Sequence, residues 1–179
     1  MKKLLLALTF VLSLAASSAM AQTPDPENTL YLDLKDGRVV IQLRPDLAPK
    51  HVARIKELVR QHFYDGLIFH RVIAGFMAQG GDPTGTGTGG SGQNIPAEFS
   101  GEPFVRGVVG AARSASPNSA DSQFFIMFGE TDSLNGQYTV WGKVTSGMDF
   151  VDKIAKGEPP ANPDKIIKMQ IAADADKKK

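Results

Sequence analysis

One arginine stands among large apolar side chains in the segment from Tyr64 to Asp82, which reads YDGLIFHRVIAGFMAQGGD. Arg71 ends an apolar run, and Gln79 follows in the same segment. A charged or polar group among apolar side chains costs desolvation free energy unless it has hydrogen-bond partners. The segment is therefore compatible with two roles for Arg71: a fixed guanidinium donor in a binding groove, or a structural side chain that bridges backbone carbonyl groups.

Other common catalytic patterns are missing from the sequence. The chain has no cysteine, and His51, His62 and His70 do not have the spacing of a zinc site. There is no G-x-S-x-G motif of the kind that presents a nucleophilic serine. We therefore expect no metal site and no cofactor, and we expect His51 and His62 to be exposed or helix-capping residues.

A glycine-rich run has the spacing of a nucleotide-binding loop. Gly85, Gly87 and Gly90 fit G-x-G-x-x-G, but this motif indicates a nucleotide site only between a strand and a helix. The residues from Ser91 to Pro96 do not begin a helix. A flexible surface loop whose backbone turns close to a groove is the simpler interpretation.

The pattern of apolar residues predicts a mainly β domain. In residues 30–34 and 39–43 an aliphatic residue occupies every second position, as in half-buried strands. Asp36-Gly37 lies between these two segments, which indicates a hairpin. Pro49 begins a helix that ends near Gln61. Further strands are expected at residues 67–72, 107–112, 123–128, 139–144 and 166–171, with a second short helix at 148–154. Many short strands between Gly-, Ser- and Pro-rich segments favour an all-β barrel or sandwich, here with two helices over its open ends.

The first 21 residues have the layout of a secretory signal peptide. Lys2 and Lys3 precede an apolar run from Leu4 to Ala16, and small residues then lead to Ala21, after which cleavage is expected. The apolar run is shorter than the roughly 20 residues that span a bilayer, which disfavours a membrane anchor. The segment predicts export to the periplasm, or secretion from a cell without an outer membrane.

The remaining 158 residues suit a single compact domain. We expect a flexible lead-in at 22–28, the domain at 29–172 and a polar tail at 173–179. Two of the 20 basic residues lie in the leader, whereas all 19 acidic residues lie after it. The exported chain therefore has 18 basic and 19 acidic residues and is nearly neutral. This balance gives no electrostatic reason to expect nucleic acid as a partner, and no later segment is apolar enough to insert into a membrane.

Three stretches of the sequence resemble the cyclophilin family of peptidyl-prolyl cis-trans isomerases. The first is the Arg71 segment, in which an aromatic residue, His, Arg and two aliphatic residues precede Phe-Met-x-Gln-x-Gly. The second is GVVGAARSASPNSADSQFFIMF at residues 107–128, and the third is DSLNGQYTVWGKV at 132–144. The resemblance extends from Leu30 to Ile171 and implies a closed eight-stranded antiparallel β-barrel capped by two α-helices.

The resemblance also implies an activity and a site. The chain is expected to accelerate rotation about X-Pro bonds in proline-containing, unfolded or partly folded polypeptides during the folding of exported proteins. Arg71 would donate to the prolyl nitrogen, and Gln79 would position Arg71 and a substrate carbonyl. An apolar cup for the proline ring would come from Phe76, Met77, Phe125 and Leu134, with Tyr138 on its rim. Backbone groups near Arg113 and Ser114 would hold the residues before the proline.

The sequence departs from many family members at two positions. Ser133 replaces a tryptophan at the rim of the pocket, and we therefore expect weakened binding of cyclosporin. Tyr138 replaces a histidine, and since it keeps an aromatic wall with a polar tip we expect activity to persist. The resemblance further implies a monomer.

Two other functions remain open from the sequence. The same fold could hold proline-containing segments without turnover, although binding planar proline alone would not require Arg71. It could also act as a general chaperone, which would need a large exposed apolar patch beyond the groove.

Overall fold

The architecture comes from a computed structural model, which describes residues 25–175. The predicted signal peptide, residues 22–24 of the lead-in and residues 176–179 of the tail lie outside the described residues. The strands are β1 (Thr29–Leu34), β2 (Gly37–Leu43), β3 (Arg71–Ile73), β4 (Met77–Gly80), β5 (Val108–Ala111), β6 (Phe124–Met127), β7 (Val140–Ser146) and β8 (Lys168–Ile171). The helices are α1 (Pro49–Arg60), α2 (Met148–Asp152) and α3 (Ala172–Ala175), with short 3-10 helices η1 (Pro26–Asn28) and η2 (Asp132–Leu134).

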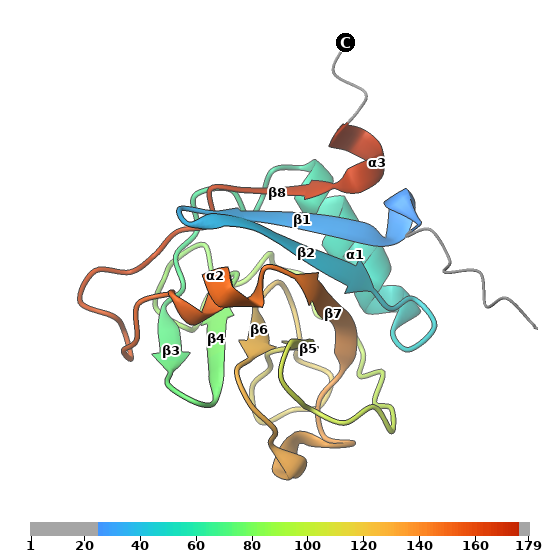
Figure 1. Ribbon diagram of the computed structural model, residues 1–179. Coiled ribbons are helices and arrows are strands. Elements are labelled where there is room, and N and C mark those ends of the chain that lie inside the picture. The colour runs from blue at the N-terminus through green and yellow to red at the C-terminus, as the bar shows by residue number, and fades with distance from the viewer. Residues whose placement is uncertain (1–24, 176–179) are drawn as a thin grey trace, which may run out of the picture.

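All eight strands form one curled antiparallel sheet in the order β3-β4-β6-β5-β7-β2-β1-β8. The mainly β prediction is confirmed, but the expected closed barrel is wrong, since among residues 25–175 the sheet is open between β3 and β8. The chain between α2 and β8 lies at this opening (Figure 1), where Gly157 pairs with Val72 and Lys165 with Ile68. Because this segment occupies the edge of β3, the two edge strands do not form a ladder with each other.

The helices occupy separate places around the sheet (Figure 1), with α1 against β7 and β8 and α2 against β2. Pro49 is in the first turn of α1, as predicted. Short helices lie at both ends of the described chain. Asp25 caps η1 in the predicted lead-in, and α3 spans the end of the predicted domain and the start of the predicted tail, where Asp174 pairs with Arg60 of α1. Among the described residues, no helix has both the length and the apolar character needed to cross a bilayer.

The main core is built around aromatic residues on one face of the sheet. Phe124 is fully buried and packs edge-on against Trp141, Tyr64 and Phe69, with ring centroids 5.8 to 6.3 Å apart. The Tyr64 hydroxyl donates to the Ser122 carbonyl at 3.0 Å, so this buried polar atom has a partner. The contact joins the chain before β3 to the start of β6, and it thereby fixes the strands that carry Arg71 and Phe125.

His51 lies in α1 and His62 just beyond its end, and their surroundings differ. His51 is buried, with its Nδ1 2.7 Å from Glu98 Oε2, so our expectation of an exposed or capping residue was wrong there. Glu98 also accepts hydrogen bonds from the backbone N–H groups of Lys50 and His51 at the start of α1. Burial lowers the pKa of His51, and the hydrogen bond to Glu98 opposes this shift. His62 is exposed, as expected, and pairs with Asp65.

Candidate active site

A second apolar cluster lies on the sheet face opposite the main core. Side chains alternate along a strand, so Phe124 enters the main core whereas Phe125 joins the second cluster with Met77 and Phe104. The ring of Phe104 stacks on that of Phe125 at a centroid distance of 5.7 Å, and Tyr138 meets Phe125 edge-on at 5.9 Å. These rings form an apolar wall on the outside of β5 and β6.

This wall encloses a small pocket of about 120 Å³. Its lining combines apolar side chains with polar ones, of which Arg71 and Gln79 come from the neighbouring strands β3 and β4. The lining residues are Arg71, Phe76, Met77, Gln79, Ala112, Arg113, Phe125, Leu134 and Tyr138. The pocket therefore has an apolar floor and one cationic, hydrogen-bonding side.

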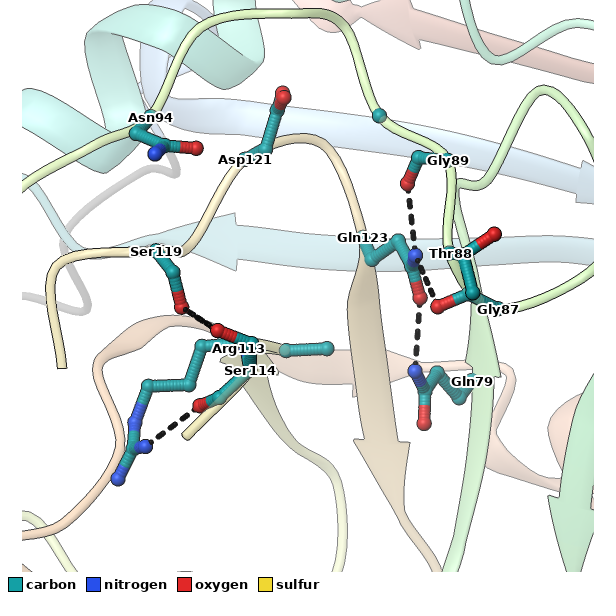
Figure 2. Close-up of a pocket in the computed structure, with 12 residues that line it drawn as sticks. Gln79, Gly87, Thr88, Gly89, Asn94, Arg113, Ser114, Ser119, Asp121 and Gln123 are labelled. Carbon is teal, nitrogen blue, oxygen red and sulfur yellow. Dashed lines mark hydrogen bonds between the residues drawn. The ribbon is translucent and has the colours of Figure 1, made fainter. Parts of the chain in front are cut away.

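The polar side is a chain of hydrogen bonds that starts at Arg71. In the β3–β4 ladder Arg71 lies opposite Gln79, and its Nη1 donates to Gln79 Oε1 at 3.4 Å. Gln79 Nε2 donates to Gln123 Oε1 at 2.9 Å, and Gln123 Nε2 donates to the carbonyl oxygens of Gly87 and Gly89. Figure 2 shows Gln123 between Gln79 and these two carbonyl groups. The amides thus fix the orientation of the guanidinium relative to the pocket.

The side chain of Arg113 forms hydrogen bonds with backbone carbonyl groups of the protein itself. Its guanidinium donates to the carbonyl oxygens of Gln137, Ser114 and Ala115, and its Cζ lies 4.4 Å from the centroid of the Tyr138 ring. Because these contacts engage all three nitrogens, the side chain holds the two loops of the rim together. A ligand could therefore bind the backbone groups near Arg113, whereas the guanidinium is already engaged.

A second hollow of about 380 Å³ is shown in Figure 2. It adjoins the first pocket and shares Gln79, Ala112 and Arg113 with it. The glycine-rich run forms one wall, at residues 87–90, and the segment from Ser114 to Asp121 contributes to the other. No helix follows the run before β5 in the described chain, so it lacks the strand–helix context of a nucleotide site.

Two carboxylates hold the glycine-rich run, which we expected to be a flexible loop near a groove. Buried Asp82 accepts hydrogen bonds from the backbone N–H groups of Thr84, Gly87 and Gly89, and Asp121 accepts those of residues 91–93. Burial alone would raise the pKa of Asp82. The hydrogen bonds from Thr84, Gly89 and Gly87 outweigh it and lower the pKa to about 2. The loop does lie beside the groove, and it is anchored there.

The comparisons with known proteins agree with this geometry. Residues 29–171 match the family model described as cyclophilin type peptidyl-prolyl cis-trans isomerase/CLD. The chain belongs to the cyclophilin family. It is therefore an enzyme that catalyses cis-trans isomerisation of peptidyl-prolyl bonds.

Relatives and solved structures extend the match to most of the chain. A probable peptidyl-prolyl cis-trans isomerase of Brucella suis is 58% identical over 95% of each chain. Peptidyl-prolyl cis-trans isomerase B of Bacillus subtilis is 45% identical over 73% of this chain and 92% of its own. Cyclophilin AquaCyp293 from Hirschia baltica superposes with a TM-score of 0.78 at 31% identity, over 84% of this chain and 76% of its own. A Cryptosporidium parvum cyclophilin crystallised in the presence of the dipeptide Ala-Pro has a TM-score of 0.74 at 30% identity, over 80% and 98% of the two chains.

Eight of the nine site residues that we predicted for a cyclophilin groove line the smaller pocket. The ninth, Ser114, lines the adjoining hollow instead. The predicted alternation between Phe124 and Phe125 is confirmed by their separate clusters. The roles of these residues in binding and catalysis stay predictions.

Sequence reasoning missed several residues that line or support this candidate site. Gln123 lies two positions before Phe125, so strand alternation could have placed it on the pocket face. Ala112, Asp82 and Asp121 carry no such signal, because their importance depends on contacts between distant segments. Among residues 25–175, no group of three or more His, Asp or Glu side chains is arranged to hold a metal ion.

Proposed function

We propose that this enzyme lowers the barrier to X-Pro rotation by aiming the guanidinium of Arg71 at the prolyl nitrogen. Amide resonance sets that barrier at about 18–20 kcal/mol. In the twisted state the nitrogen becomes pyramidal and regains a lone pair, which a fixed cationic donor stabilises. Since the planar forms offer no such lone pair, the interaction favours the twisted state selectively.

One observation carries the proposal: Arg71 lies at the edge of an apolar pocket that is large enough for one proline ring. Gln79 would hold Arg71 and bind a substrate carbonyl. The cup for the ring would be formed by Phe76, Met77, Phe125, Leu134 and Tyr138. Backbone groups near Arg113 and Ser114 would hold the residues before the proline, because the Arg113 side chain is already engaged. The Ala-Pro dipeptide used with the related Cryptosporidium protein supports a proline-containing substrate.

The substrates would be unfolded or partly folded polypeptides outside the cytoplasm. The layout of residues 1–21 supports export to the periplasm with cleavage after Ala21, and the resemblance to cyclophilins supports a monomer. N-terminal sequencing of the protein recovered from cells that make the full chain should then begin at Gln22. Retention of Met1 in the exported fraction would contradict this.

Ser133 is exposed on η2, consistent with a pocket rim that binds cyclosporin weakly.

The catalytic proposal is tested with a short X-Pro peptide, the full chain and two variants. Arg71→Ala should lower kcat/KM by about a hundredfold to a thousandfold, the usual cost of removing a donor that acts in the transition state. Arg71→Lys keeps the charge but loses the planar guanidinium, so it should restore little. Peptide binding, measured by titration, should persist in both variants. Equal loss of binding and turnover would show that Arg71 serves ground-state binding instead.

A further inference from the structure

A carboxylate from a distant part of the chain contacts Arg71 on the side away from Gln79. Glu158 Oε2 lies 2.8 Å from Arg71 Nε, and both side chains are about half exposed. Glu158 belongs to the segment between α2 and β8, which runs past β3 at the open side of the sheet (Figure 1). It lies outside the three sequence stretches that carry the resemblance to cyclophilins.

Backbone pairing places Glu158 beside Arg71. Val72 and Gly157 exchange two backbone hydrogen bonds of 2.8 and 2.9 Å in an antiparallel bridge. In such a pairing the next residues in each direction also lie opposite each other, so Glu158 faces Arg71 across the edge of β3. On the other flank Arg71 lies opposite Gln79. The arginine is thus the middle member of a row of three polar side chains.

The two neighbours bind different nitrogens of the guanidinium. Glu158 accepts from Nε, and Gln79 accepts from Nη1. A guanidinium has five N–H donors in one rigid plane, so contacts at two of its nitrogens fix the orientation of the whole group. The remaining donors are on the two terminal nitrogens, and Arg71 itself lines the pocket.

We propose that Glu158 is a positioning residue for Arg71, which it holds with the terminal nitrogens toward the pocket. The inference rests on the catalytic role proposed for Arg71. A long flexible side chain that is fixed in advance loses less conformational freedom when the twisted amide forms. The orientation of the donor matters most in the twisted state, so loss of Glu158 should lower kcat and leave KM nearly unchanged.

The opposite effect is physically conceivable, since a carboxylate beside a cation reduces the field that the cation exerts. The contact is half exposed and therefore screened by water and salt. We accordingly expect the gain from orientation to exceed the loss from partial neutralisation. The sign of the change in kcat separates these two effects.

The experiment uses the full chain with Glu158→Ala, Glu158→Gln and a matched control, Asp152→Ala. Asp152 forms a similarly exposed ion pair with Arg106, at 2.7 Å, and neither residue lines the pocket. Exchange of a short X-Pro peptide, followed by NMR, gives kcat and KM. Glu158→Ala should lower kcat about tenfold with KM within about twofold. Glu158→Gln retains an acceptor oxygen and should recover most of the rate, and the control should match the wild type.

A spectroscopic readout reports on the position of Arg71 directly. The ¹H–¹⁵N signal of Arg71 Nε should be protected from solvent exchange in the wild type and in Glu158→Gln, and should lose that protection in Glu158→Ala. A raised kcat, an unchanged kcat, or an effect confined to KM in Glu158→Ala would overturn the proposal.

Two reference variants separate this proposal from that for Arg71. If Arg71→Ala keeps full activity, the catalytic role of Arg71 fails, whatever Glu158 does. If Arg71→Ala collapses while Glu158→Ala does not, only the positioning role fails. The double variant Arg71→Ala/Glu158→Ala should be no slower than Arg71→Ala, because Glu158 acts through the arginine. A further loss would show that Glu158 acts by another route and would overturn the inference.

Discussion

Phe124 and Phe125 are neighbours in β6, yet they belong to different parts of the molecule. Phe124 is fully buried and contacts the aromatic rings of Tyr64, Phe69 and Trp141. Phe125 is nearly as buried, but its side chain lines the smaller pocket. The same strand thus supports a close-packed core on one face and a partly open binding surface on the other.

The two faces also differ in their polar groups. The main core has few, and the buried hydroxyl of Tyr64 is satisfied by a backbone carbonyl. The pocket face carries the row of Glu158, Arg71 and Gln79, which the strand register holds beside apolar rings. Stability is therefore expected to depend mainly on one face and turnover on the other. Variants that affect one property alone are the direct way to test this division.

The largest expected effect on stability comes from truncating the two neighbouring phenylalanines in turn. Phe124→Ala should lower the free energy of unfolding by about 3–5 kcal/mol, because it leaves a cavity among packed rings. Phe125→Ala should cost less, since one side of its ring already borders open space, but it should raise KM for an X-Pro peptide about tenfold or more. Urea denaturation and peptide exchange kinetics measure the two quantities. Equal losses of stability would refute the division between the faces.

A smaller effect on stability is expected from Asp82, the carboxylate that anchors the glycine-rich run. Asp82 has its pKa lowered to about 2, from an ordinary value of 3.8. A lowered pKa in the folded state means that the ionised group stabilises the fold above about pH 4, and that this contribution disappears as the pH falls toward 2. Asp82→Asn should therefore cost about 2 kcal/mol at pH 7, and the difference from the wild type should vanish in acid.

Denaturation of both proteins between pH 7 and pH 2 checks this expectation. Asp152→Asn is a suitable control, because Asp152 also has a lowered pKa, caused by its pairing with Arg106, but is exposed. A difference between wild type and Asp82→Asn that stays constant down to pH 2 would show that the amide fails for steric reasons unrelated to charge. Such a result would show that packing, and not the charge of Asp82, holds the glycine-rich run in place. The two faces of the sheet would then not differ in their dependence on charge.

Much of this organisation follows from local sequence patterns. Alternation in the strands separated Phe124 from Phe125, and the spacing of Arg71 and Gln79 places them opposite each other once β3 and β4 form a hairpin. The Pro49 helix also begins where its sequence predicts. These features depend on residues close together in the chain, for which periodicity and turn chemistry are informative.

The features that we missed depend on distant segments. Glu158 is 87 residues from Arg71, and the bridge between Val72 and Gly157 brings them together. The same bridge covers the edge of β3 and leaves the sheet open, contrary to the closed barrel that we expected. Burial of His51 likewise requires Glu98, which lies 47 residues away. No local pattern reports such contacts.

The role of Gly110 likewise depends on contacts with other segments of the chain. Its substitution is expected to change stability least among the variants considered. It lies opposite Phe125 in the β5–β6 ladder, and a Cβ there would lie 2.5 Å from Phe125 Cζ and 2.7 Å from Phe104 Cε1. Gly110→Ala should push both rings toward the pocket. Overpacking of this kind should cost roughly 1 kcal/mol, at the low end of its range because the open pocket gives the rings room to move.

The effect of Gly110→Ala on substrate should be larger than its effect on stability. Displaced rings would fill part of the space for the proline, so KM should rise about tenfold while the unfolding midpoint changes little. Gly101→Ala is the matched control, since nothing lies within 4 Å of the position its Cβ would occupy. If KM is unchanged in Gly110→Ala, the Phe104–Phe125 stack does not set the size of the pocket. If stability falls by as much as in Phe124→Ala, the pocket face is packed as tightly as the core, and the difference between the two phenylalanines does not separate stability from function.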